Sequence, residues 1–307
     1  MLLSFASLVE AANISSTAAG GNWSATTTWV GGVVPGNMDN VTIVGSSRVT
    51  VDVNNAACAT LTVNSATDAQ TGTLAFNNNS VLTVSGAVTI GGTGTRRGSI
   101  NMTNGGTLKI GGAVTLGNNM FTAGTGTVEY TGANPTIARL VYQNLTFSGS
   151  GTAGAVTPLI IRGNLSNTGG GTLNFGASNV VLGGTTATNQ IAGFTTTGTV
   201  SMTKTSGIAT FTGNVSGRAI IINGPGGTLT LGAGLTHTFT GAWTRIAGTL
   251  IGGSSVLRIG GNVMGTGGGA FNPGIGTVEW NRAGAQNIAP VTYYNLTLSN
   301  SGAKTVT

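Results

Sequence analysis

Apolar and polar residues alternate in short runs along most of the chain, and the runs end at Gly, Asn or Ser. Alternation with a period of two is typical of half-buried β-strands, and these residues are typical of the turns between them. Helical periodicity is almost absent. The pattern therefore predicts an all-β protein made of many short strands, from 41–43 near the start to 296–298 near the end. Among them are 81–84, 107–110, 219–222, 228–231 and 277–280.

One phrase recurs along the chain: two apolar residues in alternation, then Gly, a small or polar residue, an apolar residue, and Thr or Ser. The first clear copy is 82–89, and 108–115 repeats it. The spacings of its glycines are 26, 51, 50, 28 and 20 residues, which correspond to one or two units of about 25. The glycines are Gly86, Gly112, Gly163, Gly213, Gly241 and Gly261.

Self-similarity in this range of lengths is the signature of stacked, solenoid-type folds. We therefore expect a parallel β-helix, or β-solenoid, with coils of about 25 residues. Coils of variable length favour the right-handed type over the left-handed hexapeptide type. One such coil cannot bury its own apolar face, but a stack of coils can.

A longer repeat overlies the short one. Residues 126–130 (GTVEY) return as 276–280 (GTVEW), and 142–148 return as 293–299, with offsets of 150 and 151 residues. This unit of about 150 residues corresponds to six coils of the expected length. It also permits an alternative fold, two tandem β-sandwiches, which the shorter period disfavours.

Composition narrows the function classes. Of 307 residues, only 6% are charged and 54 are Gly, and the net charge of +6 arises because there are only six acids. The basic residues are scattered, whereas a nucleic-acid-binding protein clusters them in a patch; we expect no nucleic-acid partner. Because Cys58 is the one cysteine, no intrachain disulfide is expected. It lies in a run of small and apolar residues, which predicts a buried core position.

The beginning of the chain differs from the rest. Residues 1–12 contain a short apolar run, 2–9, that resembles an export signal without a basic start, or a docking segment for another subunit. Residues 13–307 are expected to form one continuous solenoid, with a capping module at about 20–65 and repeats at about 66–307. No apolar stretch reaches 18 residues, so no membrane-spanning segment is expected.

The capping module carries the sharpest motif, a phrase with two Trp, a Pro-Gly and two Asp. It resembles the opening module of large secreted bacterial surface proteins, in which such a phrase precedes β-helical coils. The later phrases YxNLT(F/L)S and GTVE(Y/W) resemble the repeats of those proteins. The resemblance implies a secreted, cell-surface β-helical adhesin or structural protein, and it carries no catalytic residues. The motif consists of 21–24 (GNWS), 28–32 (TWVGG), 33–36 (VVPG), 39–43 (DNVTI) and 49–52 (VTVD).

Residues that could carry chemistry are few and separated. Glu129 and Glu279 are equivalent positions 150 residues apart, so we expect them six coils apart and unable to act as an acid–base pair. Asp39 and Asp52 are expected to bind backbone amides in turns. His237 is the only histidine, which makes a metal site improbable. Polysaccharide-active β-helices need clustered Asp, Lys and Arg on one face, and none is visible here.

Aromatic residues could form a sugar-stacking surface, but capping or core packing is the favoured interpretation. These residues are Trp23, Trp29, Trp243, Trp280, Tyr130, Tyr142, Tyr293 and Tyr294. We therefore expect no enzyme, and no catalytic, cofactor-binding or metal-binding residues. The favoured function is an extracellular structural scaffold that self-associates through its ends or its N-terminal segment into fibres. The alternative is an adhesin module that binds carbohydrate or a host surface.

Overall fold

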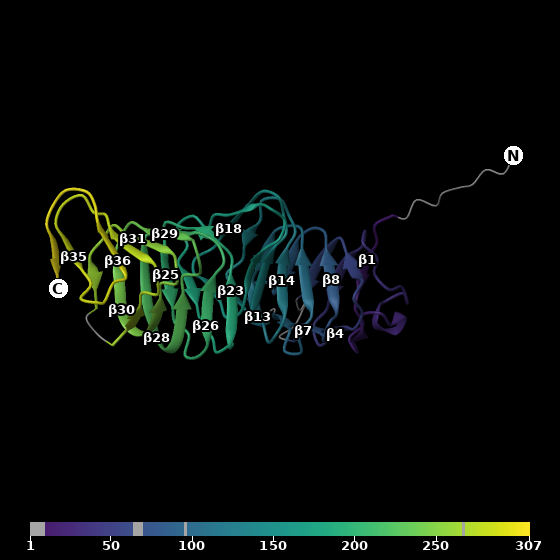
Figure 1. Cartoon of the computed structure of the whole chain (residues 1–307). Coiled ribbons are helices and arrows are strands. Elements are labelled where there is room, and N and C mark those ends of the chain that lie inside the picture. Colours follow the sequence, from purple (N-terminus) through teal and green to yellow (C-terminus); the bar gives the residue numbers. More distant parts are fainter. Residues whose placement is uncertain (1–9, 64–69, 95–96, 266–267) are drawn as a thin grey trace. The chain divides into compact units, whose positions relative to one another are not determined.

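The computed structural model describes residues 10–63, 70–94, 97–265 and 268–307. Apart from one short 3-10 helix, η1 (Thr26–Thr28), the secondary structure of these described residues consists of β-strands. The strands pair in parallel and wind through about 12 turns of a β-solenoid (Figure 1). The predicted solenoid is confirmed. The alternative of tandem sandwiches is wrong, because sandwiches are built from antiparallel sheets.

The chain divides into two compact units, Met1–Gly126 and Thr127–Thr307. In the first unit, successive coils contribute one strand each to three sheets. The first sheet contains β1 (Asn13–Ser15), β3 (Asn40–Ile43), β6 (Thr60–Val63), β9 (Val88–Ile90) and β12 (Val114–Leu116). The second contains β2 (Gly21–Asn22), β4 (Arg48–Val51), β7 (Thr71–Phe76), β10 (Arg97–Asn101) and β13 (Asn118–Thr122). β5 (Ala56–Cys58), β8 (Val81–Val84) and β11 (Thr107–Ile110) form the third side.

The second unit also has three sides, which we name by their first strands. The β14 face contains β14 (Thr127–Tyr130), β17 (Asn144–Phe147), β20 (Leu165–Asn167), β23 (Thr188–Ile191), β26 (Ile208–Phe211), the end of β28 (Ala219–Thr230), the end of β30 (Trp243–Ile251) and β33 (Ala270–Asn272). The β15 face contains β15 (Thr136–Ile137), β18 (Thr152–Ala155), β21 (Thr172–Leu173), β24 (Phe194–Thr195), β27 (Val215–Gly217), β29 (Thr236–Phe239), β31 (Val256–Ile259), β34 (Thr277–Trp280) and β36 (Asn295–Leu298).

The third side, the β16 face, contains β16 (Val141–Tyr142), β19 (Leu159–Ile161), β22 (Val180–Leu182), β25 (Thr199–Met202), the beginnings of β28 and β30, and β32 (Val263–Met264). β35 (Gln286–Ile288) pairs with β37 (Lys304–Val306). The strands β28 and β30 continue through a corner, so that each contributes to two faces.

Most coils of the second unit are shorter than most coils of the first unit. In the first unit, Val41, Leu61, Val88 and Val114 stack in register at intervals of 20, 27 and 26 residues, close to the expected 25. In the second unit, Thr188, Ile208, Thr228 and Thr249 stack at 20, 20 and 21 residues. Shorter corners account for the difference. At Gly207 the backbone has φ +76° and approaches the previous coil so closely that a Cβ would lie 2.2 Å from the Thr186 carbonyl oxygen.

Because the coils of the second unit are short, the two copies of the long repeat are separated by more coils than expected. The phrase GTVEY lies in β14, whereas GTVEW lies in β34, on another face of the same unit. Seven steps along the β14 face lead from β14 to β33, and β34 follows β33 on the next face. The repeat therefore spans seven coils and one further face, rather than the expected six coils.

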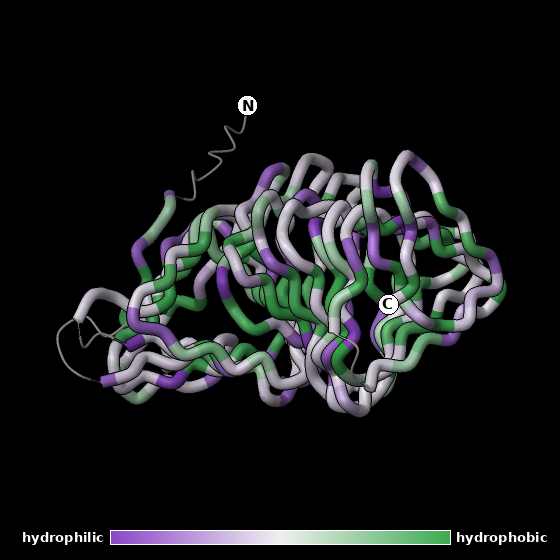
Figure 2. The backbone as a smooth tube through the Cα atoms, turned by 90° about the vertical axis from the view of Figure 1, so that its left-hand side faces the viewer, coloured by the Kyte–Doolittle hydropathy of each residue, from purple (hydrophilic) through white to green (hydrophobic). Residues whose placement is uncertain are grey.

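Side chains alternate between the interior and the surface along these strands. In β14, Val128 and Tyr130 are 2% and 0% exposed, while Thr127 and Glu129 face outward. Figure 2 shows the apolar segments stacked behind one another, with polar residues on the outer turns. Each coil thus shelters the apolar side chains of the next, as the repeat pattern predicts.

Candidate functional sites

The two glutamates of the long repeat lie on different faces of the second unit and serve equivalent structural roles. Glu129 Oε1 accepts a hydrogen bond from Ser148 Oγ at 2.6 Å, and Glu279 Oε1 accepts one from Ser299 Oγ at 2.8 Å. Glu279 also pairs with Arg258 Nε at 2.8 Å. These contacts connect neighbouring coils. The two carboxylates do not meet, as the sequence predicts, although more than six coils separate them.

Asp39 and Asp52 bind backbone amides near the N-terminal motif. Asp39 accepts hydrogen bonds from the amides of Ala12 at 2.9 Å and Gly36 at 2.7 Å. Asp52 accepts hydrogen bonds from the amide and the hydroxyl of Ser24, at 3.1 and 2.6 Å. The prediction that these acids bind backbone amides is confirmed; the bond from Gly36 to Asp39 lies within a turn, whereas Asp52 binds a residue 28 positions away in the sequence.

His237 is buried inside the second unit with both ring nitrogens bonded. Nδ1 accepts from the Val215 amide at 3.2 Å, and Nε2 lies 2.8 Å from the Leu231 carbonyl oxygen. Since Nδ1 accepts and Nε2 must donate, the ring is the neutral Nε2–H tautomer. Burial lowers its pKa below the ordinary value. Within the described residues, no group of three or more His, Cys, Asp or Glu lies together as a metal site would require.

Cys58 is 1% exposed in β5, as predicted for core filler. Burial, with a further contribution from the Asp39 carboxylate, raises the pKa of its thiol to about 12. A thiol in this environment stays protonated and is a poor nucleophile.

The tryptophans are core residues. Trp23, Trp29, Trp243 and Trp280 are at most 2% exposed. Trp23 and Trp29 pack edge to face, with ring centroids 4.9 Å apart, and Trp29 Nε1 donates to the Trp23 carbonyl oxygen at 2.8 Å. The packing interpretation is confirmed for these rings, which offer no stacking surface for a sugar.

The tyrosines reveal a motif that the sequence reasoning missed. The Tyr142 hydroxyl donates to the Ala138 carbonyl oxygen at 2.7 Å, and the Tyr293 hydroxyl donates to the Ala289 carbonyl oxygen at 2.6 Å. In both copies the tyrosine hydroxyl stabilises the corner through a hydrogen bond to the carbonyl oxygen four residues earlier. The 151-residue offset between the tyrosines was visible in the sequence, but only the structure shows what their hydroxyl groups bind. Tyr294, by contrast, is 62% exposed.

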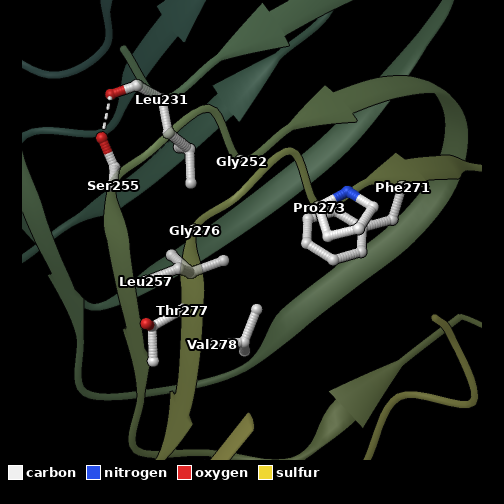
Figure 3. Close-up of a pocket in the computed structure, with 9 residues that line it drawn as sticks. All are labelled: Leu231, Gly252, Ser255, Leu257, Phe271, Pro273, Gly276, Thr277 and Val278. Atoms are coloured by element: carbon white, nitrogen blue, oxygen red, sulfur yellow. Dashed lines mark hydrogen bonds between the residues drawn. The ribbon is translucent and has the colours of Figure 1, made fainter. Parts of the chain in front are cut away.

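The described part of the second unit contains an apolar crevice and an open groove. The first is an apolar crevice between Leu231, Leu257, Phe271 and Val278, crossed at its rim by the hydrogen bond from Ser255 Oγ to the Leu231 carbonyl oxygen (Figure 3). It has no room for a water molecule. The second is an open groove of about 280 Å³ whose polar lining residues are Asn167, Thr172, Thr195 and Asn214.

A buried lysine–asparagine pair is the most unusual polar contact of the second unit. Lys204 is 0% exposed and Asn189 2% exposed. Lys204 Nζ donates to Asn189 Oδ1 at 2.5 Å and to the Thr186 carbonyl oxygen at 3.0 Å. Nothing in the sequence marks Lys204, because its neighbours are ordinary turn residues.

The coil that contains β36 exposes side chains that are buried in an equivalent coil. Leu296 and Leu298 of β36 are 43% and 50% exposed, whereas their repeat equivalents, Leu145 and Phe147 of β17, are both 0% exposed. β17 is covered by β20, with Leu145 opposite Leu165. The difference therefore lies in the covering strand and not in the phrase itself.

Comparisons with protein-family models, with curated protein sequences and with solved structures found no match. In the part of the chain that the structure describes, no helix has the length and apolar character needed to cross a membrane.

Proposed function

We propose that this chain is an extracellular structural protein, a β-solenoid scaffold that assembles end to end into surface fibres. The uncovered side chains of β36 carry the proposal. Leu296 and Leu298 belong to a phrase whose other copy is fully buried by the next coil, so their surface is suited to a further β-layer. A strand edge with apolar side chains beside it is a template for strand addition.

The N-terminal module offers a second apolar surface. Val30, Val33 and Met38 are 63%, 58% and 50% exposed in the loop that follows η1. A contact between the β36 surface of one copy and this loop of the next joins two different patches. Such head-to-tail contacts do not close into a dimer and instead produce rings or open filaments.

The composition supports an extracellular scaffold rather than a catalyst. Charged residues make up 6% of the chain, and four of its six acids, Asp39, Asp52, Glu129 and Glu279, bind backbone amides, serines or an arginine. The resemblance of residues 21–52 to the opening module of secreted bacterial surface proteins points in the same direction.

Two measurements test the proposal. Immunogold labelling of intact source cells tests the location, and label confined to the cell interior would contradict it. Negative-stain microscopy of the purified chain tests the assembly: we expect filaments that lengthen as concentration rises. Short, monodisperse particles at all concentrations would contradict the fibre.

Carbohydrate binding is a second candidate, and the groove between Asn167 and Asn214 is the observation that favours it. Its amide and hydroxyl groups are donors and acceptors suited to sugar hydroxyls. Glycan-array binding that is lost in Thr195→Val would support this function, and an array without binding would contradict it.

A further inference from the structure

The pair Lys204–Asn189 places a primary amine against a side-chain carboxamide in a buried position. The donor–acceptor distance of 2.5 Å between Nζ and Oδ1 is shorter than the usual range of about 2.7–3.2 Å for an N–H···O hydrogen bond. Because a carbonyl carbon lies about 1.2 Å from its oxygen, this contact brings the amine alongside the Asn189 Cγ atom. We propose that Lys204 and Asn189 join through an intramolecular isopeptide bond between Nζ and Cγ, with release of ammonia.

The step balances without a co-reactant. The lone pair of the neutral amine attacks Cγ, the Nζ–Cγ bond forms, and the Cγ–Nδ2 bond breaks. One proton passes from Nζ to the departing Nδ2, which leaves as ammonia. Nothing is oxidised or reduced, and the product is a secondary amide.

The surroundings of Lys204 destabilise the charged form of its amine. Burial lowers the pKa of Lys204 below the ordinary value, and its two hydrogen-bond acceptors, Asn189 Oδ1 and the Thr186 carbonyl oxygen, are uncharged. A neutral amine has two N–H groups, which these two acceptors satisfy; for the attack, the amine turns so that its lone pair faces Cγ in place of the N–H bonded to Oδ1. The next coil packs closely against the base of this side chain: a Cβ at Gly227 would lie 2.5 Å from the Lys204 Cβ atom.

The state of the leaving group, Asn189 Nδ2, supports the proposal independently of the Lys204 contact. Asn189 Nδ2 is buried and has no hydrogen-bond partner in the described structure. A buried donor without an acceptor is costly, so a purely hydrogen-bonding role would leave a permanent penalty at this atom. Departure of Nδ2 as ammonia removes the unpaired donor.

The bond can form at a useful rate because the fold holds the Lys204 amine next to the Asn189 amide. Two groups held in contact by a fold react with effective molarities of about 10⁵–10⁸ M, and exclusion of water protects the amide from hydrolysis. We expect a single maturation event after folding. Its product would tie the corner before β26 to β23, the strand on which β26 stacks through the register pair Asn189–Ala209. The tie would join successive coils covalently in a chain that has one cysteine.

Mass spectrometry of the purified, denatured chain tests the inference directly. We expect a mass lower than that of the sequence by one ammonia. Trypsin cuts after Lys and Arg, and a modified Lys204 blocks the cut before Thr205, so the tryptic fragment spans 163–218. A further cut after Phe194 should leave two peptides that remain joined.

Three variants make the assignment specific. Lys204→Arg should restore the full mass, whereas Lys304→Arg, at a lysine bonded only to the carbonyl oxygens of Arg282 and Gly284, should keep the deficit. Asn189→Asp should lose water in place of ammonia and reach the same product as the wild-type chain. A wild-type chain of full mass that is cleaved at Lys204 overturns the inference. So does an ammonia loss that maps to the Asn-Gly pairs 104–105 or 223–224 with Lys204 cleaved, since that loss is succinimide formation.

Discussion

Leu298 in β36 and Phe147 in β17 are equivalent positions of the same phrase, 151 residues apart, yet Leu298 is 50% exposed and Phe147 is 0% exposed. The strand beyond each residue makes the difference, since β20 covers β17. In a stack of coils, the energy that a side chain contributes is decided by its neighbour in the next coil.

This relationship predicts that truncation to Ala lowers the free energy of unfolding much more at Phe147 than at Leu298. Phe147→Ala should lower the free energy of unfolding by about 3–5 kcal/mol, because it opens a cavity in a fully buried layer. Leu298→Ala should change it by no more than about 0.5 kcal/mol in the monomer, because the side chain is half exposed. Urea unfolding at low protein concentration measures both. Equal costs would show that Leu298 is covered in the monomer.

The tyrosine corners predict a second difference. Tyr142→Phe leaves the buried Ala138 carbonyl oxygen without the hydroxyl donor at 2.7 Å and should cost about 1–3 kcal/mol. Tyr293→Phe removes the matching bond to Ala289 from a less buried ring and should cost less, about 1 kcal/mol. Thermal or urea unfolding of the two variants provides the comparison. A neutral Tyr142→Phe would mean that the hydroxyl does not hold the corner.

His237 predicts a pH dependence of stability. The folded chain holds the ring neutral with a lowered pKa, while the unfolded chain takes up a proton near the ordinary pKa of 6.5. The unfolded state therefore binds more protons below pH 6.5, and this stabilisation is complete above pH 6.5 and is lost as the pH falls toward the folded-state pKa. We expect a lower urea midpoint at pH 5.5 than at pH 7.5. His237→Gln should be less stable at pH 7.5 and should lack this pH dependence; an unchanged slope in the variant would assign the effect to other groups.

Much of the fold could be predicted because the strands are encoded locally. The alternation at 81–84, 107–110 and 277–280 predicts β8, β11 and β34 with their observed bounds. The corners between the strands are harder to predict from the sequence. Residues 219–222 and 228–231 were expected as separate strands, but β28 continues from Ala219 to Thr230 because the corner between them stays extended. The length of a corner decides which strand stacks on which, and no local pattern reports it.

Among the candidate sites, too, some residue roles could be predicted from the sequence and others could not. The roles of Asp39, Asp52 and the tryptophans followed from residue type and spacing. The pair Lys204–Asn189 could not be predicted, since its two residues are brought together by the stacking of one coil on the next and each alone is an ordinary polar residue.

Self-association through the exposed coil is the central proposal, and sedimentation equilibrium of the wild-type chain beside the double variant Leu296→Asp/Leu298→Asp tests it most directly. We predict that the mass of the wild-type chain grows with concentration, while the double variant stays a monomer of about the same stability, because only half-exposed side chains are changed. A wild-type chain that remains monomeric at every concentration, or a double variant that associates equally well, would contradict the account.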